Sequence, residues 1–244
     1  MDFPVEYLDA LLAFFITTLG ATLQGSIGFG LGLISVPLLV LLDPKFVPGP
    51  VLLAALCLTL LLAYREHHAI NFREIGWAIA GRALGSMLGA LVLLLIPRED
   101  ISLWVGIMVL LAILMSAVGL SLPLNRSSLV GAGIFSGLMG TTSAIGGAPM
   151  ALVYQHQKGP RLRGSLSSIF VFGTIIGIVT LIIIGRFGRT ELQLALVLFP
   201  GIFLGYFLSC RTSKILDKGF IRPAVLLAAA ASGLVVILRY LSAV

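Results

Sequence analysis

Long runs of apolar residues, separated by short polar connectors, make up almost the whole chain. Eight such segments cover residues 8–42, 50–64, 75–97, 102–120, 128–154, 167–185, 192–209 and 223–241. A helix that crosses a bilayer needs about 20 predominantly apolar residues. Charged connectors, such as residues 65–68 and 98–100, separate the segments. The pattern therefore predicts an all-α polytopic integral membrane protein.

The first segment is too long for one straight crossing, because a helix over residues 8–42 would extend about 52 Å. Glycines interrupt it between Gln24 and Gly30, and they interrupt the fifth segment between Gly137 and Gly147. We expect a break at each place, which makes either two half-helices in one kinked crossing or a re-entrant hairpin. Lipid cannot satisfy the uncovered backbone groups, so each break must face protein, water or a bound solute.

The two interrupted segments share a spaced pattern of glycine and proline. Three pairs lie 112 positions apart: Gly25 with Gly137, Gly28 with Gly140, and Pro37 with Pro149. We therefore expect two related four-segment units, residues 1–122 and 123–244, with Pro37 and Pro149 as structural breaks. Within the units, Gly81-x-x-x-Gly85 and Gly201-x-x-x-Gly205 have the spacing that lets helix backbones approach closely.

The shape of the breaks decides the topology. If each broken segment crosses once, each unit has four crossings, the repeats are parallel, and Lys and Arg outside the spans divide nine to six between the two faces. If each is a hairpin, each unit has three crossings, the repeats are inverted, and the division becomes ten to five. The positive-inside rule slightly favours the inverted arrangement. Both arrangements put the two termini outside.

Composition narrows the functional classes. The chain is 59% hydrophobic and 11% charged, whereas a soluble domain has about 25% charged residues. The net charge of +6 reflects basic loops on one membrane face, so no nucleic-acid partner is expected. No carboxylate and no histidine lies deep in a segment, which argues against an intramembrane enzyme and against a direct proton relay. We expect no catalytic residue, metal site or cofactor.

The broken segments instead predict a binding site for an anion. Half-helix N-termini present free N–H groups and the positive end of the helix dipole, and glycines let the backbone approach a small oxyanion. The candidate residues combine these glycines with amide and hydroxyl donors: Gln24, Gly25, Ser26, Gly28, Phe29, Gly30, Gly137, Gly140, Thr141, Thr142, Ser143, Gly146 and Gly147. The alternative is a pair of closely packed turns whose hydroxyls bond neighbouring carbonyls.

Arg82 is the one charged residue well inside a segment, about 10 Å from the end near Ile75. An intramembrane arginine is a functional candidate, here as the counter-charge of an anion. An arginine at this depth can equally extend its side chain to the membrane interface. The sequence leaves both interpretations of Arg82 open.

The two broken motifs resemble the signatures of a known family. Residues 25–32, Gly-Ser-Ile-Gly-Phe-Gly-Leu-Gly, with Val36-Pro37-Leu38-Leu39, are similar to the first signature of the TauE/SafE membrane permeases. Residues 137–149, with Tyr154, resemble the second. The likeness extends over essentially the whole chain, although Ala148 stands where many members have proline. It implies a bacterial or archaeal inner-membrane permease that exports small sulfur-containing anions, such as sulfite or sulfoacetate.

The sequence thus predicts an alternating-access permease with a midplane site where the two broken segments meet. The expected partners are a small anion, the lipid bilayer and a coupling ion, H+ or Na+, and a homodimer is compatible with the sequence. Two other classes stay open. An anion channel or facilitator would need no coupling ion, and a membrane scaffold would carry no flux.

Overall fold

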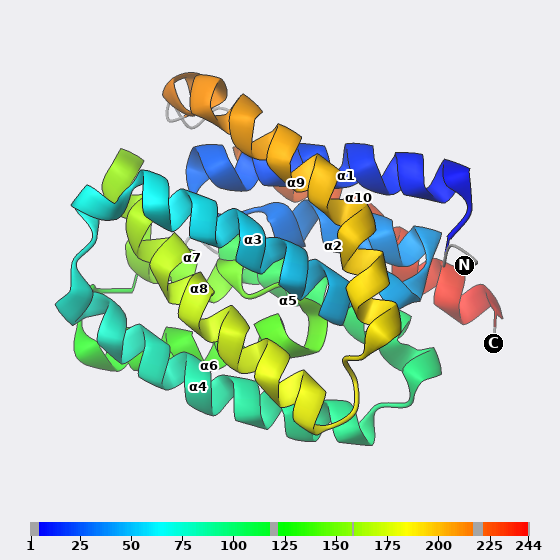
Figure 1. Cartoon of the computed structure of the whole chain (residues 1–244). Coiled ribbons are helices and arrows are strands. Elements are labelled where there is room, and N and C mark those ends of the chain that lie inside the picture. Colours follow the sequence, from blue (N-terminus) through cyan, green and yellow to red (C-terminus); the bar gives the residue numbers. More distant parts are fainter. Residues whose placement is uncertain (1–4, 118–121, 158, 217–221, 244) are drawn as a thin grey trace.

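The structure, a computed structural model, describes residues 5–117, 122–157, 159–216 and 222–243, and the regular elements among them are all helices (Figure 1). The α-helices are α1 Tyr7–Ile27, α2 Leu31–Leu42, α3 Gly49–Arg65, α4 Phe72–Leu95, α5 Ile101–Ala117, α6 Arg126–Ser143, α7 Gly147–Tyr154, α8 Gly159–Ile183, α9 Arg189–Leu216 and α10 Arg222–Ala243. Short 3-10 turns η1, η2 and η3 lie at Pro44–Phe46, His67–Ala69 and Arg98–Asp100. Each predicted apolar segment corresponds to one helix or, for the two interrupted segments, to a pair of helices.

Five helices are long and apolar enough to cross a membrane, and α2, α3 and α10 are shorter apolar helices. Large apolar side chains point outward along them. On α4, for example, Leu88, Leu91, Leu94 and Leu95 are all exposed. Exposed leucines on successive turns need an apolar solvent, and the protein is therefore a multi-pass membrane protein.

The first interrupted segment is a re-entrant hairpin and not a kinked crossing. The Ser35 hydroxyl of α2 donates to the Ile16 carbonyl of α1 across 3.1 Å. A Cβ on Gly20 would lie 2.1 Å from the Ser35 hydroxyl oxygen. Residues 16 to 20 and residue 35 can adjoin only if α2 runs back along α1. The break at residues 28–30 therefore reverses the chain.

The second interrupted segment folds back in the same way. The Ser136 hydroxyl donates to the Gly146 carbonyl (2.5 Å), across the break at residues 144–146. At the other end of α7, the Leu122 N–H, which precedes α6, donates to the Leu152 carbonyl (3.3 Å). The chain therefore enters along α6 and returns along the short helix α7.

With two hairpins, three further helices remain in each half of the chain: α3 to α5 and α8 to α10. The first residues of α1 and the last residues of α10 lie at the same end of the bundle (Figure 1). In the hairpin alternative of the sequence analysis, the connector charges divide ten to five between the two faces.

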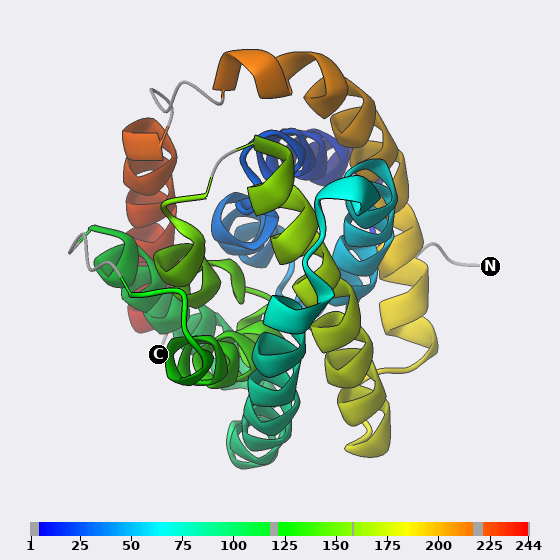
Figure 2. The same cartoon turned by 90° about the vertical axis from the view of Figure 1, so that its left-hand side faces the viewer.

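Helices of the two halves pack reciprocally. The α4 helix lies along α6, and α9 lies along α1, while α3 and α8 pack together between them (Figure 2). Glycines lie at the α4–α6 and α1–α9 contacts. A Cβ on Gly85 of α4 would lie 2.0 Å from the Ile134 carbonyl oxygen of α6, and one on Gly205 of α9 would lie 2.6 Å from the Thr18 carbonyl oxygen of α1. The small-x-x-x-small spacing thus lies at helix contacts, as the sequence predicted.

Candidate functional site

The two breaks meet in the interior of the bundle. A Cβ on Gly32, in the first turn of α2, would lie 2.3 Å from the Ala144 carbonyl oxygen. A Cβ on Gly147, the first residue of α7, would lie 3.2 Å from Cβ of Phe29. Glycine at residue 32 is therefore needed for the hairpins to touch. Residues more than 110 positions apart in the sequence form one site.

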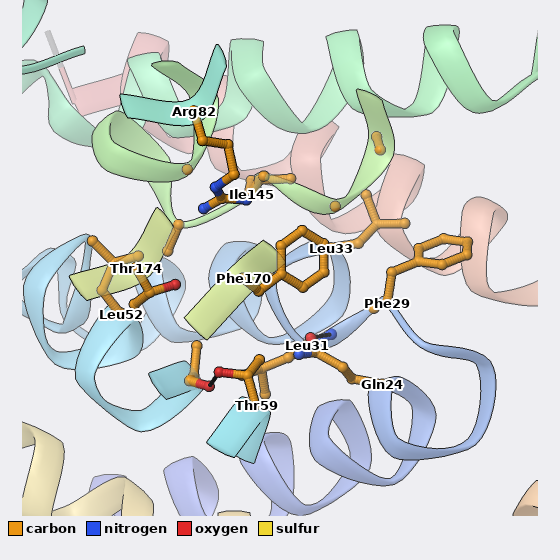
Figure 3. A pocket seen from close by; sticks show the side chains of 18 residues that line it. Gln24, Phe29, Leu31, Leu33, Leu52, Thr59, Arg82, Ile145, Phe170 and Thr174 are labelled. Carbon is orange, nitrogen blue, oxygen red and sulfur yellow. Dashed lines mark hydrogen bonds between the residues drawn. The ribbon is translucent and has the colours of Figure 1, made fainter. Parts of the chain in front are cut away.

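A cavity of about 560 Å³, counting its open side, lies at this meeting point; we call it the central cavity (Figure 3). Its wall is formed by residues of helices α1 to α4 and α6 to α8 and of the two breaks. Seven of the residues predicted from the sequence line it: Gln24, Phe29, Gly30, Arg82, Gly140, Gly146 and Gly147. Apolar side chains, such as Leu52 and Phe170, make up much of the remainder.

The first break depends on glycine. Gly28 and Gly30 have φ angles of 92° and 135°, which side-chain-bearing residues rarely adopt. Gly28 ends α1 with a bond from its N–H to the Gln24 carbonyl (2.8 Å). The Gln24 side chain then reaches across the break, where Oε1 accepts the Leu31 N–H (3.2 Å). Gln24 thus satisfies one of the free N–H groups at the start of α2.

The second break is built differently. Its left-handed residue is Ala144, with φ 59°, and Gly146 has an ordinary φ of −85°. Gly140 lies within α6, one turn before the break. The breaks therefore begin 116 positions apart, at Gly28 and Ala144, and the offset of 112 does not pair equivalent backbone positions.

Pro37 and Pro149 do not break the chain, contrary to the prediction. Pro37 lies inside α2, and Pro149 lies in the first turn of α7. A proline in a first turn removes an N–H that has no intrahelical partner, so it fits there without loss. Proline inside a membrane helix is tolerated where neighbouring helices cover the freed backbone, and Pro37 is buried.

Arg82 points into the central cavity (Figure 3). Its relative exposure is 3%, so the side chain does not extend to the interface. The guanidinium lies over the Phe170 ring, 5.1 Å from the ring centre, and Nη1 donates to the Ser136 hydroxyl (2.8 Å). Its Nε has no hydrogen-bond partner in the structure. Among the described residues that line the cavity, none is a carboxylate that could neutralise Arg82.

Glycines of three segments surround the guanidinium. A Cβ on Gly173 of α8 would lie 1.8 Å from Nε of Arg82. A Cβ on Gly140 would lie 3.2 Å from Nη2, and one on Gly146 would lie 3.1 Å from Nη1. These positions have no room for a side chain while the guanidinium stays where it is. The glycines thus hold the cation at the wall of the cavity.

Two helix N-termini face the same space. The first-turn residues Gly32 and Leu33 of α2, and Gly147 and Ala148 of α7, line the central cavity. Neither helix has a side-chain bond from its own N-cap residue. The positive ends of both helix dipoles are directed toward the cavity, and Arg82 adds a full positive charge there. The combination suits a small anion.

The hydroxyl residues predicted for the site do not line the cavity. Their hydroxyls bond carbonyls one turn earlier: Ser26 to Thr22 (2.7 Å), Thr142 to Leu138 (2.9 Å) and Ser143 to Met139 (2.7 Å). Thr141 packs against two glycines, with its Cβ 3.2 Å from a Cβ built on Gly89 and its Oγ1 3.2 Å from one built on Gly177. Three of these hydroxyls therefore behave as the packed-turn alternative expected.

The remaining predicted glycines lie at helix contacts around the cavity. Gly25 packs against Ser209, and its carbonyl accepts Nη2 of Arg65 (2.6 Å). Gly28 packs against Arg163, and a Cβ on Gly137 would lie 2.3 Å from the Arg82 carbonyl oxygen. These glycines let the hairpins approach α4, α8 and α9.

The residues of this site that sequence reasoning missed include Ser136, Phe170, Gly173 and Thr174. Ser136 begins the second motif, at the position 112 residues after Gln24, and both side chains reach across their break. Gly173 forms a small-x-x-x-small pair with Gly177. Those signals were present in the sequence. Nothing in it distinguished Phe170 and Thr174 from other residues of the sixth segment.

Across the part of the chain that the structure describes, no group of three His, Cys, Asp or Glu residues could hold a metal ion. The comparison with protein families gives one match. The family described as "Sulfite exporter TauE/SafE" matches residues 12–236, which include both hairpins and Arg82. No curated protein and no solved structure matches the chain.

Proposed function

The chain belongs to the sulfite exporter TauE/SafE family, and on that premise we propose that it exports small sulfur-containing oxyanions or organosulfonates through the central cavity. Members of this family are membrane transporters and not enzymes. Sulfite and sulfoacetate are the substrate types that we assign to the site. The membrane is the inner membrane of a bacterium or archaeon.

A single observation carries the assignment of the site. The Arg82 guanidinium is buried among apolar helices, faces the central cavity, and leaves Nε without a hydrogen-bond partner. A charge buried without a counter-ion costs several kcal/mol, and this cost falls when an opposite charge binds beside it. A small oxyanion provides both the negative charge and acceptors for the free N–H group. The site therefore favours an anion over a neutral or cationic solute.

The two helix N-termini support the same assignment. Main-chain N–H groups at Gly32 and Gly147 lie at glycines, where no side chain shields the backbone from a ligand. The apolar wall, which includes Phe29 and Phe170, excludes water and strengthens each electrostatic contact. An organosulfonate would place its carbon chain against this wall and its sulfonate near Arg82.

The reciprocal packing of the two halves supports alternating access. We assign residues 1–122 and 123–244 to two inverted repeats that exchange their first helices, since α4 packs on α6 and α9 packs on α1. Movement of one unit against the other would open the central cavity to each face in turn. The coupling ion in this proposal is H+ or Na+.

Uptake of radiolabelled sulfite and sulfoacetate into proteoliposomes, with imposed pH or sodium gradients, tests the proposal. We expect saturable flux that one of the two gradients drives uphill. Flux that only dissipates the anion's own gradient, without saturation, would contradict coupled transport and favour a facilitator. Absence of flux for both anions, from protein that binds neither of them, would overturn the substrate class.

A further inference from the structure

A second cavity lies at the end of the bundle where α3 begins. Its volume is about 560 Å³, counting its open side, and it lies between η1, the first turn of α3, η3 and the connection from α8 to α9. Three cationic side chains line it: Lys45, Arg98 and Arg186. We call this cavity the basic pocket. None of its described lining residues belongs to the central cavity.

Arg186 is held in a fixed position with one nitrogen unsatisfied. Its Nη2 donates to the carbonyls of Leu93 (2.9 Å) and Ile96 (2.7 Å), at the C-terminal end of α4. Its Nη1 is buried and has no hydrogen-bond partner in the structure. Burial and the positive charge of Arg98 lower the pKa of Arg186 from its ordinary value. Burial, and to a smaller extent Arg98, thus disfavour the charge of Arg186, and its Nη1 remains as a donor without a partner.

The carboxylates Glu191 and Asp43, which lie in or near the basic pocket, already have partners within the protein. Glu191, the one carboxylate among the described lining residues, accepts the Gly188 N–H through Oε2 (2.8 Å). Asp43 accepts the Lys45 N–H (2.9 Å) and lies 3.6 Å from the Lys45 ammonium. The first turn of α3, at Gly49, has no side-chain cap and adds the positive end of its dipole. The described lining residues therefore carry a net positive charge.

An apolar barrier separates the basic pocket from the central cavity. Leu52 lines the central cavity and Leu93 lines the basic pocket, and both belong to one buried cluster with Ile178 and Leu181. Each cavity is therefore lined by one member of the same four-residue apolar cluster. An anion that passes between the central cavity and this face of the membrane would meet the basic pocket at the outer side of this barrier.

We propose that the basic pocket is a second oxyanion site, which holds the transported anion at the mouth of the pathway. Nη1 of Arg186 offers an unsatisfied N–H group, and Lys45 and Arg98 provide charge from exposed positions. The identity of the anion rests on the proposed function, whereas the presence of the site rests on this pocket alone. Charges at a pathway mouth raise the local concentration of an oppositely charged solute.

Equilibrium binding of radiolabelled sulfite to purified protein in a neutral, lipid-free detergent tests this proposal. The wild type should bind two anions per chain. The double variant Lys45→Gln/Arg98→Gln should lose one of them, with affinity at that site falling about tenfold or more. The control Arg189→Gln/Arg239→Gln removes two charges of the same sign from exposed positions outside the pocket, and it should keep both anions. Equal binding by the two double variants would overturn the proposal, whether the wild type binds one anion per chain or two.

The variant Arg82→Gln separates this proposal from the proposed function. If both are correct, Arg82→Gln loses the central anion and keeps the anion of the basic pocket. If only the second site exists, Arg82→Gln binds as the wild type does, while Lys45→Gln/Arg98→Gln loses the one anion. If only the central site exists, Arg82→Gln alone abolishes binding.

A lipid headgroup offers the same oxyanion chemistry as a free solute. Nanodiscs of zwitterionic and of anionic phospholipid distinguish the two sources. We expect two sulfite ions per chain in both. Loss of the Lys45- and Arg98-dependent sulfite in anionic nanodiscs alone would assign the pocket to a lipid headgroup and overturn its role for the solute.

Discussion

The two re-entrant hairpins have similar sequence motifs, but the charged side chains that contact them differ. At the first hairpin, Arg65 and Arg163 donate to the carbonyls of Gly25 (2.6 Å) and Ser26 (3.1 Å) at the end of α1. Glu66 forms ion pairs with both arginines, 3.0 and 2.9 Å from their Nε atoms. Glu66 thus offsets part of the positive charge, and the three side chains hold the end of α1 in place.

At the second hairpin, Arg82 lies beside Gly140 and Gly146, and no carboxylate is among the described residues that line the cavity around it. Its described hydrogen bond goes to a neutral hydroxyl, that of Ser136. The backbone also differs, because the first break needs two glycines with positive φ and the second needs none. In the proposed function, the first hairpin therefore provides geometry, whereas the second holds the α4 residue Arg82 through Ser136.

The largest effect is expected from a substitution that displaces the Arg82 guanidinium but leaves Arg82 itself unchanged. A Cβ at residue 173 would lie 1.8 Å from Nε, so Gly173→Ala should push the flexible end of the side chain out of place. We expect roughly a hundredfold loss of sulfite flux at low substrate concentration, since contacts to a charged group contribute up to about 3 kcal/mol. Proteoliposome uptake measures this loss.

Gly131→Ala is the matched control, because a Cβ at that position meets nothing within 4 Å. In an Arg82→Gln background, Gly173→Ala should add little further loss, because both changes remove the same contact. Wild-type flux from a well-folded Gly173→Ala protein would contradict the role of Arg82.

A smaller effect is expected at the hydroxyl that positions Arg82. The Ser136 hydroxyl accepts from Nη1 of Arg82 and donates to the Gly146 carbonyl. Ser136→Ala removes both bonds, and we expect about a tenfold rise in the substrate concentration for half-maximal flux. Ser232→Ala, whose hydroxyl bonds carbonyls of its own helix α10, is the control. An unchanged concentration dependence would mean that Ser136 does not position the cation.

The backbone difference between the breaks is tested by stability. Gly30→Ala forces a side chain into φ 135° and should destabilise the fold by about 1–2 kcal/mol. Ala144→Gly removes a side chain at φ 59°, and this gain is offset by about 0.5–1 kcal/mol of added chain entropy in the unfolded state. Thermal unfolding in detergent should therefore show a lower midpoint for Gly30→Ala than for Ala144→Gly. An equal fall of the unfolding midpoint in both variants would contradict the difference in backbone requirement between the two breaks.

The smallest effects are expected at hydroxyls that bond their own helix. Ser26→Ala and Thr142→Ala should each change sulfite flux by less than about twofold, because neither residue lines the central cavity and hydroxyls of this kind contribute little to a helix. The same uptake assay measures both. A loss as large as that of Ser136→Ala would place these hydroxyls in the binding site.

The fold was largely predictable because apolar length and glycine breaks determine where membrane helices lie. The hairpin shape was less accessible, since a kinked crossing and a hairpin differ in sequence only through the connector charges. The start of α8, at Gly159 and not at residue 167, was missed because Arg163, Ser165 and Ser167 read as a polar connector. These side chains are buried against other helices and never meet lipid.

The site was only half predictable. Glycine and amide positions of the motifs marked the walls of the cavity, and five of them line it, together with the predicted residues Phe29 and Arg82. The second break lies four residues later than the motif implied, because Ala144 takes the left-handed conformation that glycine takes in the first. The orientation of Arg82 depends on Gly173, which is 91 positions away and on another helix.

Sulfite flux through proteoliposomes of Arg82→Gln tests the central claim most directly, with Arg82→Lys and the exposed Arg189→Gln as comparisons. The Arg82 assignment predicts that Arg82→Gln loses nearly all saturable flux, that Arg82→Lys keeps part of it, and that Arg189→Gln matches the wild type. Lysine retains the charge but not the planar fork of donors. Saturable flux of wild-type affinity from Arg82→Gln would contradict the claim that this buried cation binds the transported anion.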